Sequence, residues 1–375
     1  MPGPLEGVRV VELAGIGPAP FCGMILADLG AEVVRVDRPE RAGTPDTDPL
    51  NRGKKSIAAD LKSPDASGVI LRLVEMSDVL IEGFRPGVAE RLGVGPAECH
   101  ARNPRLVYGR MTGWGQDGLL AETAGHDIDY IALSGALASI GPASDPVVPL
   151  NLVGDFGGGG MLLAVGVLAA LTAARSGAPG QVVDAAMVDG SALLMAFHWG
   201  FLARGVWSPR REDNFLDGAA PWYTVYRTAD GKHVAVGAIE PQFYAELLRV
   251  LGLKDVDLPD QHDRSGWPEL RDRFGAIFAT RTRDEWEDAF RGVDACVAPV
   301  LDMTEAPAHP HNRARETFID IDGVIQPAPA PRFGGTPTGR PDAPPATGRD
   351  TDEVLSWLGY TDAEIGKLRS TGAVA

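Results

Sequence analysis

Apolar runs that end at glycines alternate with amphipathic stretches along the first half of the chain. Residues 8–15, VRVVELAG, and 31–37, AEVVRVD, are typical of strands, and residues 20–30 between them carry helical periodicity. A further helix and strand end near Gly83, and another strand is expected over residues 104–115. Strand, glycine turn, helix and strand in this order predict a parallel α/β sheet. We therefore expect residues 1–185 to form a doubly wound domain, with its ligand beyond the carboxyl ends of the strands.

The hydrophobic pattern changes after residues 186–221, which we expect to form linker helices. Residues 222–240 alternate about an Asp230-Gly231 turn, a strong signal for a β-hairpin. Pro241 suits the first turn of a helix, and Thr282 with Glu285 forms a capping box for the next one. These signals predict a small α+β domain over residues 222–325.

The remaining residues, 326–375, are expected to form an extended return segment and a C-terminal helix. From Pro327 to Pro345 the chain is rich in proline and glycine, which is typical of an extended tether. Thr361 and Glu364 then form a second capping box, which predicts the final helix.

Composition narrows the class of protein. The net charge of -16 argues against binding to nucleic acid or to anionic membranes. Three cysteines without a CxxC pair indicate neither a disulfide framework nor a metal site. The longest apolar run, residues 161–174, is shorter than the roughly 20 residues that span a bilayer, and no secretory signal is visible at the N-terminus. We therefore expect a cytoplasmic protein with no metal, nucleic-acid or membrane partner.

The first glycine turn resembles a dinucleotide-binding fingerprint only in part. Gly15 and Gly17 precede Asp37 at about the right spacing, but Pro20 stands where the third glycine is required. A tight turn is therefore favoured over a nicotinamide or flavin site. A group of basic residues leaves two interpretations open, a solvated face or a phosphate site. Its members are Arg38, Arg52, Lys54, Lys55, Lys62, Arg85 and Arg91.

Three stretches carry candidate acid/base residues. In AGHDIDY, His126 stands beside Asp127 and near Asp129, a pattern that a salt-linked surface loop also explains. In LVGDFGGGG, Asp155 precedes four glycines and an apolar helix, and we favour a functional role over a flexible loop because ordering four glycines is costly. Glu240 precedes a helix, and taken alone it is best explained by capping that helix.

Together, segments from nearly the whole chain resemble CoA-transferase family III, also called the CaiB/BaiF family, and within it the α-methylacyl-CoA racemases. Several of these segments are long and unlike other families, so the resemblance is specific. They are GVRVVELAG, GAEVVRVDRP, NRGKKSIAADLK, DVLIEGFRPGVAERLG, MTGWGQDG, AGHDIDY, NLVGDFGGGGM, AAMVDG, DGKHVAVGAIEPQF and LGYTDAEIGKLRSTGAV.

The resemblance implies an enzyme that acts on a CoA thioester without a metal ion or redox cofactor, the CoA being part of the substrate. It implies a Rossmann-like large domain completed by the C-terminal segment, a small α+β domain joined by long linkers, and an interlocked homodimer. Asp155 matches the nucleophile of the family's transferases, whereas His126 matches the histidine that racemases add. We therefore expect a 2-methylacyl-CoA racemase, with a family III CoA transferase using Asp155 as the main alternative. A dehydrogenase and a non-catalytic acyl-CoA-binding protein are more distant alternatives.

A racemase needs two acid/base groups on opposite faces of the carbon next to the thioester. By the resemblance, His126 and Asp155 supply them, Glu240 supports His126, and Asp127 belongs to the same catalytic group. We also expect backbone amides around Asp155 and Gly157 to stabilise the enolate. The CoA site would be formed by Arg38, Ala59, Asp60, Leu61, Lys62, Gly83, Phe84, Arg85, Arg91, Gly125 and Tyr130.

Overall fold

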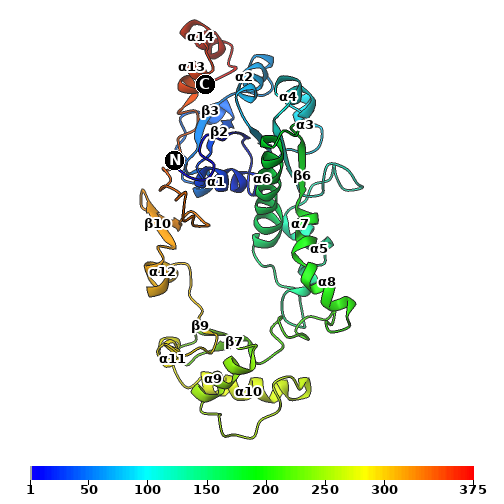
Figure 1. The fold of residues 1–375 in the computed structure, drawn as a ribbon, viewed down its shortest axis with the longest axis vertical. Helices are drawn as coiled ribbons and strands as arrows, with labels where there is room; N and C mark the ends of the chain where they lie inside the picture. The colour runs from blue at the N-terminus through cyan, green and yellow to red at the C-terminus, as the bar shows by residue number, and fades with distance from the viewer. Residues whose placement is uncertain (1) are drawn as a thin grey trace. The chain divides into compact units, whose positions relative to one another are not determined.

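The computed structural model describes residues 2–375, which divide into two compact units. The first unit contains residues 2–134, 149–195 and 315–375, and the second contains residues 135–148 and 196–314. Figure 1 shows the ribbon of both units. Each unit has a sheet and a hydrophobic core of its own.

A six-stranded parallel sheet forms the centre of the first unit. Its strand order is β3-β2-β1-β4-β5-β6, the order of doubly wound dinucleotide-binding folds. The expected parallel sheet is therefore confirmed, and β3 and β6 are two strands that the hydrophobic pattern did not predict. Both are short, and the partly exposed β6 lacks a continuous apolar run. The strands are β1 (Arg9–Leu13), β2 (Glu32–Asp37), β3 (Lys55–Ala58), β4 (Val79–Glu82), β5 (Val107–Thr112) and β6 (Val182–Ala186).

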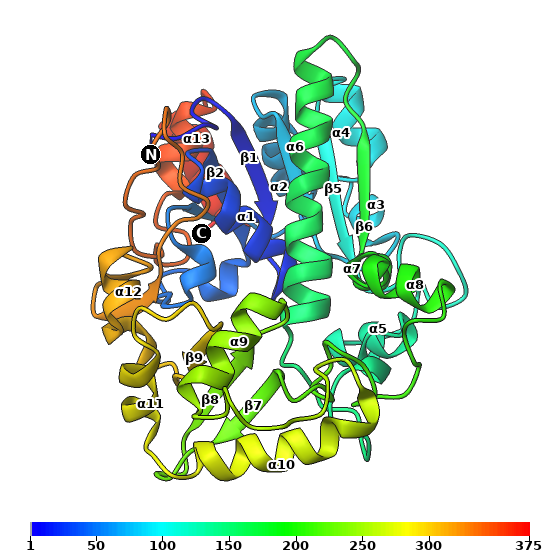
Figure 2. The same ribbon diagram turned by 60° about the horizontal axis from the view of Figure 1, so that its bottom comes forward.

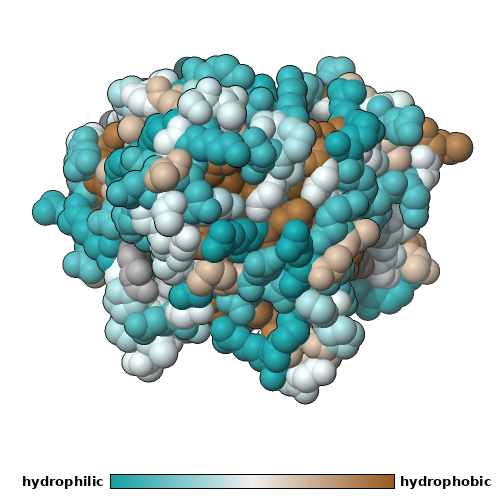
Figure 3. All heavy atoms as spheres, turned by 90° about the horizontal axis from the view of Figure 1, so that it is seen from above, coloured by the Kyte–Doolittle hydropathy of each residue, from teal (hydrophilic) through white to brown (hydrophobic). Residues whose placement is uncertain are grey.

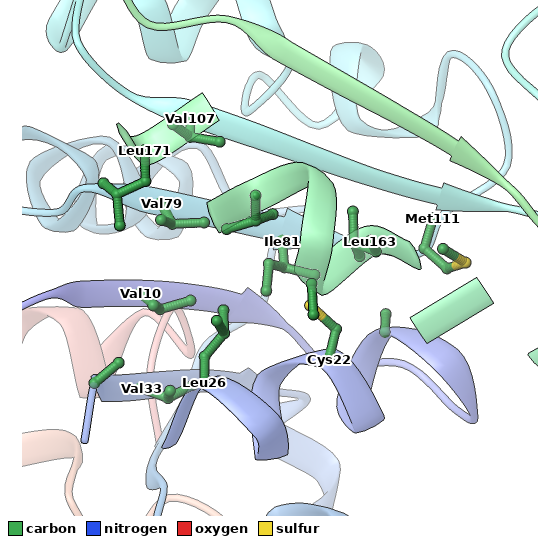
Figure 4. Packing of buried hydrophobic residues seen from close by; sticks show 14 of the residues in the cluster. Val10, Cys22, Leu26, Val33, Val79, Ile81, Val107, Met111, Leu163 and Leu171 are labelled. Atoms are coloured by element: carbon green, nitrogen blue, oxygen red, sulfur yellow. The ribbon is translucent and has the colours of Figure 1, made fainter. Parts of the chain in front are cut away.

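Helices cover both faces of this sheet, which explains why consecutive strand residues are apolar. On one face lie α1 (Pro18–Asp28) and α6 (Leu162–Arg175), side by side in Figures 1 and 2. Figure 4 shows strand residues such as Val10 and Val107 packed with Cys22 and Leu26 of α1 and with Leu163 of α6.

The opposite face of the sheet packs against helices from distant parts of the sequence. Residues Val11, Val34 and Leu80 of the strands share one buried cluster with Val69 and Leu355 of these helices. The helices are α2 (Pro64–Glu75), α4 (Pro96–Arg102), α13 (Thr351–Trp357) and α14 (Asp362–Ser370). Seen from the end where α13 and α14 lie, the surface is mainly hydrophilic, with hydrophobic residues scattered among the others (Figure 3).

The four consecutive glycines lie in a helix, not in a loop. A π-helical segment, η4 (Leu152–Met161), continues directly into α6. The continuous helix of 24 residues is long and apolar enough to cross a bilayer by length and composition, whereas the apolar run in the sequence covers only residues 161–174. Leu163, Val167 and Leu171 on one side of it are buried in the core of the first unit.

The C-terminal residues complete the first unit by binding to the edge strand β3. The amide of Ser56 donates to the Asp350 carboxylate at 2.8 Å, and the amide of Asp60 donates to the Ala373 carbonyl at 2.9 Å. Residues 328–346 before this contact contain no helix or strand. The capping box of Thr361 and Glu364 is present and begins α14, as expected.

The second unit is built on a three-stranded antiparallel sheet in the order β7-β8-β9. The expected hairpin turns at Asp230-Gly231, and the expected capping box of Thr282 and Glu285 begins α11. Trp222 is buried among the helices and donates its indole N–H to the Gln261 carbonyl at 3.0 Å. The elements are β7 (Tyr223–Arg227), β8 (His233–Gly237), β9 (Val297–Pro299), α9 (Pro241–Val250), α10 (Trp267–Phe278) and α11 (Arg283–Phe290).

The boundaries of the units differ from the sequence-based ones, and residues 196–221, expected as linker helices, belong to the second unit. Residues 186–195 belong to the first unit, because α7 (Met187–Leu194) packs against the glycines of η4. The hairpin of β10 (Phe318–Ile321) and β11 (Val324–Pro327) also belongs there, because Arg52 donates to Gln326 and to the Pro327 carbonyl. Residues 135–148 belong to the second unit, where Arg211 donates to the Ala138 carbonyl.

Candidate active site

A cavity of about 490 Å³ opens at the carboxyl ends of β1, β4 and β5 in the first unit. Doubly wound sheets bind their ligands at this edge. His126 and Asp155, which are 29 positions apart in the sequence, both line this cavity. The fold therefore brings the two expected acid/base residues to one site.

His126 is the residue that immediately precedes α5 (Asp127–Leu133), and its side chain is exposed. Its backbone amide donates to the Asp129 carboxylate at 2.9 Å, which fixes the turn into the helix. Asp129 is thus part of the helix start, and His126 is left facing the cavity.

Tyr130 forms the buried wall behind this turn. Its hydroxyl donates to the Gly125 carbonyl, and its ring meets that of Trp114 edge-on at 4.7 Å. A Cβ at Gly113 would lie 2.0 Å from the Tyr130 ring, and one at Gly125 would lie 2.7 Å from it. Gly113 and Gly125 are therefore needed to make room for Tyr130.

Asp155 is half-buried in η4, and its carboxylate is held by a neighbour that was not predicted from the sequence. Asn151, four residues earlier in the chain, donates from Nδ2 to Oδ2 of Asp155 at 3.0 Å. Gly17 lies so close that a Cβ there would stand 3.3 Å from the same oxygen. The four-residue spacing of an amide and a carboxylate in a helix was the available signal for Asn151.

Asp127 was expected among the catalytic residues, but its side chain is buried and lies outside the cavity lining. Its Oδ1 accepts the backbone amide of Asp155 at 2.7 Å, and a Cβ at Gly154 would lie 2.4 Å from this oxygen. Burial raises the pKa of the Asp127 carboxyl and the charge of Asp155 adds to the rise, although the Asp155 and Gly154 amides oppose it. The Asp127 carboxylate therefore links the start of α5, which follows His126, to the segment that carries Asp155.

The Asp155 amide, which was expected to help stabilise the enolate, is already bonded to Asp127, so stabilisation by the amides around Gly157 stays a prediction. The glycines that follow serve close packing of the helix. A Cβ at Gly158 would lie 2.6 Å from the Ser191 amide nitrogen, and one at Gly160 would lie 2.5 Å from the Pro18 carbonyl oxygen. Gly157, whose amide was also expected near the enolate, lies within the same π-helical segment.

Glu240 lies in the second unit, at the N-cap position of α9. Its side chain makes no capping hydrogen bond and is exposed. Glu240 therefore stands at the position that helix capping predicts, but its carboxylate remains available to another partner.

The residues expected to bind CoA follow the carboxyl ends of β2, β3 and β4. Arg38 lines a second cavity of about 530 Å³, which Gly17 also lines. Gly83, Phe84 and Arg85 line the cavity of His126 and Asp155. The side chains of Arg38, Lys62, Arg85 and Arg91 are exposed, Asp60 and Leu61 are half-buried, and Ala59 is buried.

Three residues of the basic group are engaged in ion pairs. Arg52 pairs with Asp28 at 2.6 Å, and Lys54 pairs with Glu12 at 2.6 Å, both inside the first unit. Lys55 bridges Glu32 and Glu353. These three residues are therefore structural in this fold and do not form a phosphate site.

Residues 2–375 contain no group of three or more His, Cys, Asp or Glu side chains arranged to hold a metal ion. That the enzyme needs no metal or redox cofactor stays a prediction.

Comparison with known proteins identifies the family. The family model described as CoA-transferase family III matches residues 5–351. This chain belongs to CoA-transferase family III. The family member named alpha-methylacyl-CoA racemase from Mus musculus is 49% identical over 370 residues, covering 98% of this chain and 96% of that protein. The Homo sapiens protein of the same name is 47% identical over 371 residues, with the same coverage of both chains.

A solved structure shares the fold. The crystal structure of a CaiB/BaiF family protein from Brucella suis has a TM-score of 0.82 and 26% sequence identity, and the match covers 96% of this chain and 100% of that one. The resemblance found in the sequence is therefore confirmed, and the mixed α/β architecture is that of the family.

Proposed function

We propose that this protein is an α-methylacyl-CoA racemase, an isomerase that interconverts the (R) and (S) forms of 2-methylacyl-CoA thioesters. The near-full-length identity to proteins of that name supports the activity. The observation that carries the proposal for this site is that His126 and Asp155 line one cavity.

The reaction is a proton transfer through an enolate. His126 removes the proton from the carbon next to the thioester, and Asp155 returns a proton to the opposite face; the roles exchange in the reverse direction. Two separate groups are required because one group cannot reach both faces of the carbon. Asn151 and Asp127 hold Asp155 by its carboxylate and its backbone amide.

Glu240 is proposed to support the basicity of His126. Its exposed carboxylate makes no capping hydrogen bond, which leaves it free to accept from an imidazole. The glutamate would come from the second unit of the same chain or from that of the partner chain.

Binding of CoA is proposed at the carboxyl edge of the sheet. Arg38, Lys62, Arg85 and Arg91 place exposed cations there on a chain with a net charge of -16. Guanidinium and ammonium groups bind phosphoryl oxygens, so these residues suit the phosphates of CoA.

A homodimer is proposed on the apolar surface of the first unit. Met161 and Val165, one turn apart on the long helix, are 46% and 58% exposed, and Leu193 of α7 is 61% exposed. Exposed apolar patches of this kind mark interaction surfaces. Sedimentation of the purified protein would measure the oligomeric state, and a monomer at micromolar concentration would exclude the dimer.

The activity is tested by isotope exchange. Purified protein is incubated with a 2-methylacyl-CoA in deuterated water, without any acceptor acid. Exchange of the α-proton with inversion at that carbon is expected for the parent protein, and inversion is lost in the His126→Asn and Asp155→Asn variants because each keeps a base on one face only. His311→Asn, at an exposed histidine of the second unit, is the control and should leave exchange unchanged.

The alternative is a CoA transferase in which Asp155 attacks the thioester as nucleophile. The half-buried Asp155 carboxylate on the cavity wall favours this transferase alternative. The alternative predicts transfer of CoA to a free carboxylic acid. In that case transfer survives His126→Asn, and no α-proton exchange occurs without an acceptor.

A further inference from the structure

Two opposite charges face each other inside the sheet next to the proposed CoA site. Glu82 ends β4 and pairs in register with Arg110 of β5. The Glu82 side chain is 0% exposed and that of Arg110 is 8% exposed. Charges this deeply buried are costly unless every member is paired.

Hydrogen bonds connect Glu82 and Arg110 to the loop that follows β4. Arg110 Nε donates to Oε1 of Glu82 at 2.9 Å, and the other carboxylate oxygen of Glu82 accepts the Phe84 amide at 2.6 Å. Arg110 also donates from both terminal nitrogens to the Glu90 carboxylate, at 2.8 and 3.3 Å. Glu90 lies in α3 (Val88–Arg91) at the far end of the same loop.

One guanidinium thus contacts both Glu82, which holds the Phe84 amide, and Glu90, near the two ends of the segment from Gly83 to Arg91. This segment carries two exposed cations, Arg85, which lines the cavity, and Arg91. At Gly87 the backbone is left-handed, with φ of 76°, in a turn that the Val88 amide closes by donating to the Arg85 carbonyl at 3.1 Å. This local turn does not attach the segment to the sheet, whereas the contacts of Glu82 and Glu90 with Arg110 do.

We propose that Arg110 is a positioning residue that holds residues 83–91 in the conformation that presents Arg85 and Arg91 to the phosphates of CoA. This inference rests on the proposed function. Arg110 lies beneath the loop and does not line the cavity, so it acts through the loop and not on the reacting carbon. A bidentate guanidinium is suited to this task because it fixes direction as well as charge.

The inference predicts a pH dependence of CoA binding. Burial raises the pKa of Glu82 to about 7, although the Phe84 amide and Arg110 oppose the rise. Protonation of Glu82 removes one of the two negative charges that hold Arg110, so CoA affinity should fall as the pH decreases from 8 to 6. The other titratable groups near the network are Glu90, Glu98, Arg91, Tyr108, Cys99 and Asp184.

The test compares variants by titration calorimetry with free CoA and by initial-rate kinetics. Arg110→Lys keeps the charge but loses the two-pronged contact, and Glu90→Gln weakens only the half-exposed end of the network. Each is expected to raise the Kd for CoA and the KM for the thioester about tenfold, with kcat changed less than about threefold. Arg102→Lys, at an exposed arginine paired with Glu75, is the matched control and should leave the Kd unchanged.

The pH arm uses Glu82→Gln. The parent protein should lose CoA affinity between pH 8 and 6, and the Glu82→Gln variant should show a flat Kd over this range. Unchanged Kd in both folded variants, Arg110→Lys and Glu90→Gln, would overturn the inference, as would a loss of kcat at constant Kd. Isotope exchange by the parent protein reports the proposed function separately, so failure of one leaves the other measurable.

Discussion

The backbone amide of Asp155 donates a 2.7 Å hydrogen bond to the carboxylate of Asp127, the neighbour of His126. This contact joins the two segments that line the cavity, because His126 begins one and Asp155 lies in the other. Two-base catalysis depends on the distance between the two bases, and a misplacement of about 1 Å can cost about a hundredfold in rate. The Asp127–Asp155 contact therefore links the two segments that carry the proposed bases.

Replacement of Asp127 tests this spacing. Asp127→Ala is expected to lower kcat by about tenfold to a hundredfold with a smaller change in KM, because the bases shift while CoA contacts remain. Asp127→Asn keeps an acceptor oxygen and should retain more activity. Initial rates of α-proton exchange provide the measurement. A proportional loss of kcat in both variants would instead indicate that the Asp127 carboxylate itself exchanges protons with the substrate.

Asn151 orients the Asp155 carboxylate through the 3.0 Å hydrogen bond from its amide. Hydrogen bonds to charged groups contribute about 1.5–3 kcal/mol, so Asn151→Ala should reduce kcat/KM by about tenfold to a hundredfold. Steady-state kinetics measure the effect, and Asn312→Ala in the second unit serves as the control. Equal kinetics in the two variants would show that Asp155 is held without Asn151.

The glycines of η4 are expected to be required for stability. In Gly160→Ala the new methyl would lie 2.5 Å from the Pro18 carbonyl oxygen, so α1 and the long helix must move apart. Overpacking of this kind costs about 1–3 kcal/mol in the free energy of unfolding, which thermal or urea denaturation measures.

Gly68→Ala provides the matched control for this substitution. Gly68 also lies in a helix, α2, but nothing stands within 4 Å of its added Cβ. This variant should be as stable as the parent protein or more stable by up to about 1 kcal/mol. If Gly160→Ala behaved like Gly68→Ala, close packing would not explain the glycine run.

The fully buried pair of Glu12 and Lys54 is expected to be essential as a pair. Burial raises the pKa of Glu12 and lowers that of Lys54, and their mutual attraction opposes both shifts. Removal of one partner leaves a buried charge uncompensated, so Glu12→Gln should lower the free energy of unfolding by about 3–5 kcal/mol. The double variant Glu12→Gln, Lys54→Met should recover part of this loss. An additive loss in the double variant would contradict coupling between the two side chains.

Much of the fold followed from the sequence because its signals are local. The runs VRVVELAG and AEVVRVD, the Asp230-Gly231 turn and the capping box of Thr282 and Glu285 each lie within a few residues, and the structure contains all of them. The resemblance to the family also pointed to His126 and Asp155, which line the same cavity in the structure. Strands β3 and β6 were missed because short strands have little pattern of their own.

The tertiary structure alone decided which polar residues are available for chemistry. Lys54 lies in a basic stretch of the sequence, but its partner Glu12 is 42 positions away, and Arg52 contacts Gln326 across 274 positions. Asp127 adjoins His126 in the sequence, yet its carboxylate points to an amide 28 positions later. The sequence shows which groups can ionise, but only folding brings distant partners within hydrogen-bond distance. Burial then determines which of those groups form structural ion pairs and hydrogen bonds and which face the cavity.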